Sequence, residues 1–333
     1  MNPPELLRVE DLAVRFPVPG SRALVHAVDG VSFSVSRGSA FGIVGESGSG
    51  KSTTAQAILR LVPAVSGRAA LNGADLLALS GRPLREARRH IQMVFQDPFA
   101  SLDPRRHAGA LVAEPLRLLE GATRRQAAER LDGLLAAVGL PPEAARLFPH
   151  QFSGGQRQRL CIARALATRP DLIVCDEAVS ALDVAIQAQI LNLLKGLQAE
   201  RGLAYVFISH DLGVVQHLCD TVAVMYLGRI VERAPVRSFF AGPRHPYSWS
   251  LISAALPAGP ARDAMKARYL VRGEPPSPID PPPGCRFAGR CPFAVERCRA
   301  EDPPLVPAGE DHAVACHRFG EIEPPRFDMA EAA

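Results

Sequence analysis

The chain has 333 residues, enough for two or three domain-sized units, and its 47% hydrophobic and 22% charged residues are ordinary for a globular protein. A formal net charge of +4 without a dense block of Lys and Arg gives no reason to expect a nucleic-acid partner. No signal-peptide pattern opens the chain, and no apolar run approaches the roughly 18 residues of a membrane span, so we expect a cytosolic protein whose membrane role comes through a partner.

Two stretches near the N-terminus alternate apolar and polar residues, as antiparallel strands with one buried face do. They cover residues 5–16 and 23–35, and a Pro- and Gly-containing turn at residues 17–20 joins them. Phe16 ends the first stretch. Its ring is either a core side chain or an aromatic surface for an adenine ring, and both interpretations stay open.

Residues 40–54, AFGIVGESGSGKSTT, predict a buried strand, a glycine-rich turn and the start of a helix. The turn GESGSGKS fits the pattern G-x-x-x-x-G-K-[ST] at every position. Glycines let backbone N–H groups point at phosphate oxygens, and the helix adds its own N-terminal N–H groups. Lys51 would reach the β- and γ-phosphates, and the Ser52 hydroxyl would bind Mg²⁺. A turn that merely caps a helix is the weaker alternative, because the flanking strand and helix are those of a P-loop.

The middle of the chain continues the alternation of helix and strand. Residues 83–89 predict a short basic helix, and residues 91–95 predict a strand that ends at Gln96, where polar groups of an α/β sheet meet ligands. From residue 98 to about residue 149 the sequence is rich in Ala, Leu and Arg, which we interpret as a helical insertion. Its periodic helical runs are residues 111–119 and 124–138.

A second candidate anion site is the run FSGGQ at residues 152–156, which precedes a helical pattern at residues 158–167. Ser153-Gly154-Gly155 could cradle an anion on the N–H groups of the helix N-terminus. Alternatively, Ser153 caps that helix with its hydroxyl, which is the more usual role of such a sequence.

Two adjacent carboxylates, Asp176 and Glu177, end the apolar strand predicted at residues 171–175. Carboxylates at the end of a buried strand are costly unless they serve a cation or a reaction. Asp176 fits the aspartate that holds Mg²⁺ in P-loop NTPases, and Glu177 could then orient and deprotonate the attacking water.

The remaining core pattern is a loop at residues 178–183, a helix at 184–199 and a buried strand at 204–209. That strand ends at His210, for which its position in a nucleotide-binding fold favours a functional role. A hairpin around Leu227-Gly228 follows. Alternating strands and helices predict an α/β fold with a largely parallel sheet.

The composition changes near residue 245. Of the 30 prolines, 14 lie from Pro257 onward, so this end cannot be rich in helix or central strand. Cys161, Cys175 and Cys219 lie in apolar runs and are expected to be buried free thiols. The other four cysteines crowd the proline-rich end: Cys285, Cys291, Cys298 and Cys316.

Over roughly the first 245 residues these motifs resemble those of the ATP-binding subunits of ATP-binding-cassette (ABC) transporters. GESGSGKS matches the Walker A motif, FSGGQ the LSGGQ signature with Phe for Leu, and LIVCDE, residues 172–177, the Walker B motif. Gln96 matches the Q-loop, residues 180–183 the D-loop and His210 the switch histidine. The chain has Ala178-Val179 where most cassettes have Pro-Thr, a departure that concerns only the local loop.

The resemblance implies an ABC-type P-loop fold with an antiparallel β subdomain and a helical subdomain at about residues 98–160. It divides the chain into a nucleotide-binding domain, residues 1–245, and a C-terminal extension, residues 246–333. The implied cofactors are ATP and Mg²⁺, with Glu177, His210 and Gln96 as catalytic residues. The implied Mg²⁺ ligands are Ser52, Gln96 and Asp176. The implied nucleotide contacts are Phe16, Gly45, Ser47, Gly48, Ser49, Gly50, Lys51, Ser52, Thr53, Asp176, Ser153, Gly154, Gly155, Gln156 and Asp183.

The C-terminal run GEPPSPIDPPPGCRFAGRCPFAVERC is similar to the extension of the oligopeptide/dipeptide importer ATPases. In that branch two homologous ATPase subunits, often non-identical, lie under two membrane permeases, and an extracytoplasmic binding protein delivers peptides. The resemblance therefore implies a peripheral protein at the cytoplasmic face of the inner membrane. It also implies a head-to-tail dimer in which the Ser153 loop of one subunit closes over the ATP of the other. Residues 99–106 would meet a permease.

The sequence is compatible with other interpretations. The ATPase does not encode which cargo is transported, so nickel complexes and sugars are alternative cargoes within this branch. A guanine-nucleotide switch would need an Asn-Lys-x-Asp motif, which the chain lacks. A soluble, non-transport ABC ATPase usually carries long coiled coils or two cassettes, and neither is visible here.

The four C-terminal cysteines predict one [4Fe–4S] cluster, and zinc is the alternative metal. Disulfides are disfavoured in a reducing cytosol. Structural zinc sites usually contain a C-x₂₋₄-C pair, which is missing among these four cysteines. A proline-rich segment cannot build its own core, so a metal would stabilise it. Nearby arginines are expected to offset the charge of the thiolates: Arg286, Arg290, Arg297 and Arg299. The resemblance to the peptide-importer branch points to the same cluster.

Overall fold

The computed structural model describes residues 4–255, 269, 271 and 273–324. Its contacts divide the chain into two compact units that interleave along the sequence. The first unit is built mainly from Ala69–Ile208. The second is built mainly from Val9–Phe33, Phe41–Arg68 and the residues that follow Ser209.

A four-stranded sheet has the order β2-β1-β4-β5, and its strands β1, β2 and β4 contribute residues to both units. The strands are β1 (Glu5–Pro17), β2 (Leu24–Ser36), β4 (Ser66–Leu71) and β5 (Ala74–Asp75). The two predicted N-terminal strands are confirmed. The β4–β5 hairpin was not predicted, although its two-residue turn Asn72-Gly73, with φ of 50° and 81°, is a strong hairpin signal.

The first unit contains three parallel strands in the order β8-β7-β6. They are β6 (Ile91–Val94), β7 (Leu172–Asp176) and β8 (Ala204–Ser209). Every residue of β7 and β8 is buried, as expected for parallel strands that are covered on both faces. The strands predicted from these apolar runs are therefore confirmed, and Gln96, Asp176 and Glu177 all follow or end strands of this parallel set.

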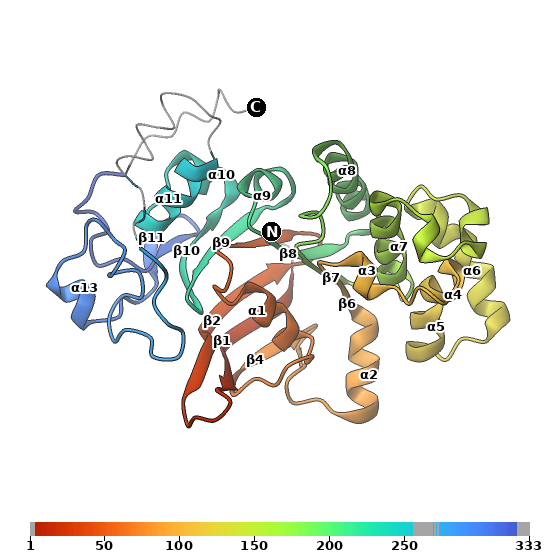
Figure 1. Ribbon diagram of the computed structural model, residues 1–333, viewed down its shortest axis with the longest axis horizontal. Helices are drawn as coiled ribbons and strands as arrows, with labels where there is room; N and C mark the ends of the chain where they lie inside the picture. The colour runs from red at the N-terminus through yellow and green to blue at the C-terminus, as the bar shows by residue number, and fades with distance from the viewer. Residues whose placement is uncertain (1–3, 256–268, 270, 272, 325–333) are drawn as a thin grey trace. The chain divides into compact units, whose positions relative to one another are not determined.

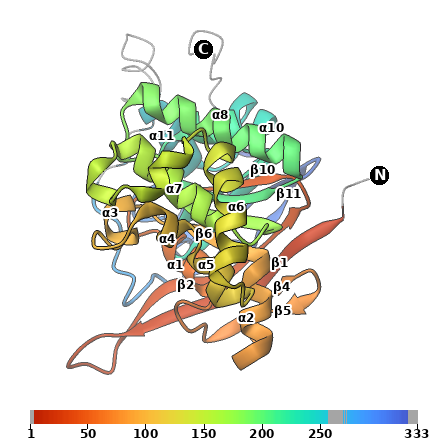
Figure 2. The same cartoon turned by 90° about the vertical axis from the view of Figure 1, so that its right-hand side faces the viewer.

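The helices α3 to α7 of the first unit gather around one another (Figure 2), as expected for a helical insertion. One predicted helix, residues 111–119, is wrong as a single element, because it divides at Ala113 into α4 and α5. Pro115 has no N–H to donate to a carbonyl one turn earlier, so a continuous helix cannot pass through it. The helices of this unit are α2 (Gly81–His90), α3 (Pro98–Ser101), α4 (Ala108–Val112), α5 (Glu114–Leu119), α6 (Arg124–Ala137), η1 (Pro142–Arg146), η2 (Pro149–Gln151), α7 (Gly154–Leu166) and α8 (Val184–Arg201).

The strands of the second unit follow the order β11-β12-β10-β9-β3, of which β11, β10 and β9 are labelled in Figure 1. β3 and β9 are parallel, whereas β9 with β10 and β10 with β12 are antiparallel. The strands are β3 (Ala40–Val44), β9 (Thr221–Tyr226), β10 (Arg229–Pro235), β11 (Val306–Gly309) and β12 (His312–Val314). The predicted hairpin around Leu227-Gly228 is confirmed. The addition of β11 and β12 was not predicted, because both are too short for a visible alternation.

The helices of the second unit include one of ten residues, α11, which begins at Pro246 and ends before the proline-rich stretch. Proline is favourable in the first turn of a helix, where its missing N–H costs nothing. Tyr247 and Trp249 of α11 are buried, and Tyr247 packs with Tyr226 and Phe287, with ring centroids 4.7 and 5.4 Å away. Among its described residues, the helices of this unit are α1 (Lys51–Ile58), α9 (Leu212–Leu218), α10 (Val236–Ala241), α11 (Pro246–Ala255) and α13 (Glu296–Ala300).

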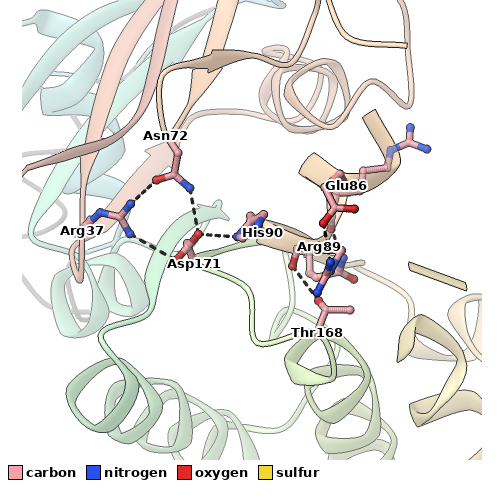
Figure 3. A network of polar contacts seen from close by, with 9 residues as sticks. Arg37, Asn72, Glu86, Arg89, His90, Thr168 and Asp171 are labelled. Carbon is pink, nitrogen blue, oxygen red and sulfur yellow. Dashed lines mark hydrogen bonds and ion pairs between the residues drawn. The ribbon is translucent and has the colours of Figure 1, made fainter. Parts of the chain in front are cut away.

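A polar network lies at the start of β7 in the first unit (Figure 3). The carboxylate of Asp171 accepts hydrogen bonds from Arg37 Nη1 at 3.4 Å and Asn72 Nδ2 at 3.0 Å, and it lies 2.9 Å from His90 Nδ1. Arg37 also donates to the Asn72 side chain. Asp171, the residue before β7, therefore contacts three other segments of the first unit through one carboxylate. These segments are the β2–β3 turn, the β4–β5 turn and the end of α2.

Cys161, Cys175 and Cys219 are buried free thiols, as predicted. Burial raises the pKa of Cys161 to about 11 and that of Cys175 to about 12, so both stay protonated at neutral pH. Within the described residues, no helix is both long enough and apolar enough to cross a bilayer.

Candidate nucleotide-binding site

The glycine-rich turn between β3 and α1 can be built only with glycine at two of its positions. Gly45 has φ 157°, and a Cβ there would lie 2.1 Å from the Met225 carbonyl oxygen. Gly50 has φ 103°, and its Cβ would lie 2.2 Å from the Ala27 carbonyl oxygen. The predicted strand, turn and helix are confirmed, and the turn is held close against its neighbours in the second unit.

Lys51, the first residue of α1, bends back over the loop that precedes it. Its side chain is 5% exposed, and Nζ donates to the carbonyl oxygens of Gly45 and Glu46 at 2.8 Å each. Lys51 thus places a positive charge within the turn, beside the N-terminus of α1. A concave turn of backbone that carries a buried ammonium and a helix N-terminus fits a phosphate group.

Two of the predicted catalytic residues meet in the first unit. Gln96 follows β6, Glu177 follows β7, and Gln96 Nε2 donates to Glu177 Oε2 at 2.9 Å. The preceding Asp176 ends β7 and is 5% exposed. The amide therefore orients the carboxylate that the sequence predicts to act on water.

The backbone at Glu177 adopts an uncommon conformation. Its φ is 45°, in the left-handed region that few residues other than glycine enter. The Glu177 N–H donates to Ile208 O at 3.0 Å, and the Glu177 carbonyl accepts from the Ser180 hydroxyl at 2.9 Å. Such strain is typical of residues that a fold holds in place for function.

Ser153 is the N-cap of α7. Its hydroxyl accepts from the Gln156 N–H at 3.3 Å, and the Gln156 side chain accepts from the Ser153 N–H at 2.9 Å, which forms a capping box. The capping interpretation is therefore confirmed. It leaves the anion interpretation open, because Gly154 and Gly155 begin the same helix.

The other predicted site residues lie at the ends of elements. Asp183 is the N-cap of α8 and accepts from the Ile186 N–H at 2.9 Å. Phe16 is half-buried near the end of β1, and His210 is exposed directly after β8. Their roles toward a nucleotide stay predictions.

The loop is also contacted by residues from the C-terminal end of the chain, which the sequence analysis did not predict. The Tyr247 hydroxyl accepts from the Glu46 N–H at 2.8 Å. Arg290 binds the Glu46 carboxylate with two hydrogen bonds, of 2.8 and 3.2 Å. No sequence signal marks either residue as a loop contact, because the partners are more than 200 positions apart.

A second connection runs through Arg286. Its guanidinium donates to the carboxylate of Asp29 and to the carbonyl of Leu227. Gly228 then donates its N–H to the carbonyl oxygen of Ser49 in the glycine-rich turn, at 2.8 Å. Burial opposes the charge of Asp29, but Arg286 and Arg229 lower the pKa of that carboxyl below its usual value, so it is ionised at neutral pH.

The four C-terminal cysteines lie near one another in the second unit. Burial raises the pKa of Cys285 to about 12, and the neighbouring thiols of Cys316, Cys291 and Cys298 add to this effect. Three of the four sulfurs accept backbone N–H groups, as thiolates that bind metals often do; the acceptors are Cys285, Cys291 and Cys316.

The chemistry of this donor set fits a metal that prefers thiolates, but the arrangement does not. Over residues 4–255, 269, 271 and 273–324, no three side chains of His, Cys, Asp or Glu are grouped so that they could hold a metal ion. The predicted iron–sulfur cluster and its zinc alternative therefore have no support from the structure. The arginines were expected to offset the charge of the thiolates, but Arg286, Arg290 and Arg297 each pair with a carboxylate instead.

Comparison with known families gives two matches. Residues 28–180 match the family described as ABC transporter, and residues 231–298 match the family described as oligopeptide/dipeptide transporter, C-terminal region. The first match covers the glycine-rich turn and the strands that carry Gln96 and Asp176, and the second covers Tyr247 and Arg290.

Curated relatives match nearly the whole chain. A probable peptide ABC transporter ATP-binding protein of Sinorhizobium fredii is 53% identical over 319 residues, which cover 94% of this chain and 89% of that protein. The oligopeptide transport ATP-binding protein AppF of Bacillus subtilis is 46% identical over 325 residues, which cover 96% of this chain and 98% of that protein.

Solved structures of ATP-binding cassettes share the fold. The cassette MJ0796, described as a dimer in a post-hydrolysis state bound to ADP and Pi, aligns with a TM-score of 0.62 and 28% identity over 70% of this chain and 99% of its own. CbiO1 of Clostridium perfringens, described as part of the transporter complex cbiONQ, aligns with a TM-score of 0.63 and 26% identity over 79% of this chain and 99% of its own.

Proposed function

This chain belongs to the ATP-binding proteins of the ABC transporter family and is an ATPase subunit, and we propose that it energises the import of oligopeptides or dipeptides. The observation that carries the proposal is the match of residues 231–298 to the C-terminal region of oligopeptide/dipeptide transporters. Relatives named as peptide ABC transporter or peptide import ATP-binding proteins support it, since they align over more than nine-tenths of the chain. Nickel complexes or sugars are the alternative cargoes, and a soluble non-transport ATPase is a more distant alternative.

The P-loop is assigned to the phosphates of ATP. In this assignment Lys51 neutralises the β- and γ-phosphates, and the Ser52 hydroxyl, Gln96 and Asp176 hold Mg²⁺. The supporting observations are the buried ammonium of Lys51 within the turn and the burial of Asp176 at the end of β7. When bound, Mg²⁺ would supply positive charge that offsets the negative charge of the phosphates. The other phosphate contacts in this assignment are Gly45, Ser47, Gly48, Ser49, Gly50 and Thr53.

Glu177 is assigned as the general base that takes a proton from the attacking water. The hydrogen bond from Gln96 fixes one carboxylate oxygen, so the carboxylate is held in one orientation. His210 is assigned as a second polar contact to the transferred phosphate, and Phe16 as the aromatic surface for adenine.

A second ATPase subunit is proposed to complete the site. The N-terminus of α7, with Ser153, Gly154, Gly155 and Gln156, would contact the nucleotide held by the partner, and Asp183 would lie near the same nucleotide. The capping box supports this role, because it fixes Ser153 while the helix N-terminus remains available to an anion. We propose that the partner is a homologous, non-identical subunit.

The membrane partners are proposed to be two permeases supplied by an extracytoplasmic binding protein, with this chain at the cytoplasmic face of the inner membrane. Phe99 is the candidate permease contact, since its side chain is 63% exposed and lies two residues after the Asp97 N-cap of α3. Arg157 lies over the Phe99 ring, with Cζ 3.9 Å from the centroid, and orients it. In this proposal residues 1–245 bind nucleotide, with residues 98–160 as the helical subdomain, and residues 246–333 form the extension.

An iron–sulfur cluster at Cys285, Cys291, Cys298 and Cys316 remains a proposal, with zinc as the alternative. The proposal rests on the sequence, which places four thiolate-forming cysteines in one proline-rich segment, and the described residues show no grouped metal site. Ligation would require the thiols to lose their protons and to approach one another more closely. Its role would be to stabilise the extension.

Transport is tested in a strain that lacks the gene for this chain. Uptake of a labelled tripeptide should fall in the deletion strain, return with the wild-type chain and stay low with Glu177→Gln. Co-purification of the tagged chain with integral-membrane proteins is the second measurement. Normal peptide uptake in the deletion strain, together with loss of uptake of a nickel complex or a sugar, would replace the proposed cargo.

A further inference from the structure

Glu46, the second residue of the glycine-rich turn, is held at all three of its polar groups. Its N–H donates to Tyr247, its carbonyl accepts from Lys51 and its carboxylate binds Arg290. Two of these three contacts come from the C-terminal part of the chain. We propose that Tyr247 and Arg290 are positioning residues for the nucleotide loop, and this inference rests on the proposed binding of ATP phosphates by that loop.

The contact from Tyr247 fixes the direction of one peptide group. Because the hydroxyl accepts the Glu46 N–H, that N–H is directed toward α11, and the carbonyl of the same residue is held by Lys51 at 2.8 Å. Tyr247 is itself fully buried and packs against the rings of Tyr226 and Phe287, which also contact each other. A rigid tyrosine therefore sets the path of the chain as it enters the turn.

The contact from Arg290 removes a charge that would oppose nucleotide binding. A free carboxylate in a loop that receives phosphates would repel them. Arg290 neutralises Glu46 with two hydrogen bonds, and its side chain is only 10% exposed. Arg290 is held in turn by the Tyr226 hydroxyl at 3.3 Å, and its guanidinium carbon lies 5.8 Å from the centre of the Tyr226 ring.

A second set of contacts to the same loop involves the same C-terminal segment. Arg286 binds the carbonyl of Leu227, and the adjacent Gly228 donates its N–H to Ser49. Arg286 and Arg290 lie between Cys285 and Cys291 in the sequence, so one short segment supplies both sets of contacts that support the turn. Order in this segment is thereby coupled to the geometry of the turn.

The test uses the full-length chain and measures MgADP affinity by calorimetry, together with kcat and KM for ATP in the assembled transporter. Arg290→Ala should weaken MgADP binding and raise KM about tenfold, because it leaves a partly buried carboxylate without its charge partner. It should leave kcat within about twofold, since a contact present in the free enzyme contributes equally to the ground and transition states.

Rescue distinguishes positioning from a merely structural role. Glu46→Gln alone should bind MgADP within about twofold of wild type, and Glu46→Gln with Arg290→Ala should recover most of the lost affinity, because no unpaired carboxylate remains. Loosening of the extension alone would give the same loss in both backgrounds. Arg297→Ala is the matched control, since this arginine of α13 belongs to the same extension and pairs with the exposed carboxylate of Glu301.

The inference is overturned if Arg290→Ala binds MgADP within twofold of wild type, or if Glu46→Gln gives no rescue. Lys51→Ala separates this failure from failure of the site itself. Loss of MgADP binding in Lys51→Ala with no effect of Arg290→Ala would refute only the positioning role. Unchanged MgADP binding in Lys51→Ala would refute the proposed phosphate site.

Discussion

Glu46 and Arg290 lie 244 positions apart in the sequence and form a two-point ion pair, with distances of 2.8 and 3.2 Å. The first belongs to the glycine-rich turn and the second to the cysteine-rich end of the chain. The pair joins the part of the sequence that predicts nucleotide binding to the part that distinguishes the peptide-importer branch. The C-terminal residues therefore support the nucleotide loop rather than only following it.

Asp171→Ala should destabilise the chain by about 1–2 kcal/mol, because Arg37, Asn72 and His90 lose a shared acceptor that is about one-third exposed. Urea unfolding followed by circular dichroism measures the change. Arg125→Ala, which breaks an exposed pair with Glu129 on α6, is the control and should change stability by less than about 0.5 kcal/mol. Equal stabilities for the two variants would contradict a structural role for the Asp171 network.

His245 should make the stability of the chain depend on pH. Burial lowers its pKa from 6.5 to about 4, so the folded state keeps the ring neutral while the unfolded state binds a proton near pH 6.5. Stability should therefore be complete above about pH 6.5 and decline toward pH 4, by up to about 1.4 kcal/mol per pH unit.

Urea midpoints at pH 7, 5.5 and 4.5 test this dependence. His245→Asn keeps an acceptor for the Tyr247 N–H, which bonds to His245 Nδ1 at 3.0 Å, but it cannot titrate. The variant should lose less stability than the wild type between pH 7 and 4.5. Parallel declines in the two proteins would assign the pH dependence to other groups.

Much of the core could be predicted from the sequence, because its signals are local. The run AFGIVGESGSGKST specifies a strand, a turn and a helix within one stretch, and the apolar strands before Gln96 and Asp176 are equally continuous. The ends of such strands place Gln96 and Glu177 within hydrogen-bond distance, as found at 2.9 Å. Periodicity was misleading at residues 111–119, where Pro115 breaks an otherwise regular pattern.

The long-range contacts could not be predicted, because ion pairs leave no periodic signal. The sequence places Arg290 beside Cys291, which suggests a role near the cysteines, whereas its ion-pair partner in the structure is Glu46. Glu232 is similar, since this fully buried carboxylate binds His312 Nε2 at 2.7 Å and so joins β10 to β12. Both pairs depend on how distant parts of the chain come together, which single-sequence patterns do not record.

Cys291→Ser should test whether the cysteine-rich end binds a cluster. If it does, anaerobically purified wild-type chain should contain iron and sulfide in equal amounts and absorb visible light, and the variant should lose both while MgADP still binds. Metal analysis and visible absorption are the measurements. Stoichiometric zinc without iron, or four titratable thiols in a folded chain, would reject the iron–sulfur proposal.

Ser153→Arg should block hydrolysis at the partner's nucleotide and spare nucleotide binding by its own P-loop. The long side chain would occupy the helix N-terminus that the partner's phosphates are proposed to reach. Ser153→Arg in this chain is combined with an Ala replacement of the P-loop lysine in the partner ATPase. In a head-to-tail dimer both substitutions affect the same nucleotide site, so the other site should still hydrolyse ATP. If Ser153→Arg blocked hydrolysis only at the P-loop of the subunit that carries it, the proposed head-to-tail dimer would be wrong.

The rate of ATP hydrolysis by Glu177→Gln tests the central claim most directly, because the amide cannot accept a proton while Lys51 and Asp176 remain in place. Glu129→Gln, which changes an exposed carboxylate paired with Arg125 on α6, is the control and should hydrolyse ATP as the wild type does. We predict that Glu177→Gln binds MgATP within about threefold of wild type and hydrolyses it at least about 100-fold more slowly. Turnover within a few-fold of wild type would contradict the assignment of Glu177 as the catalytic base.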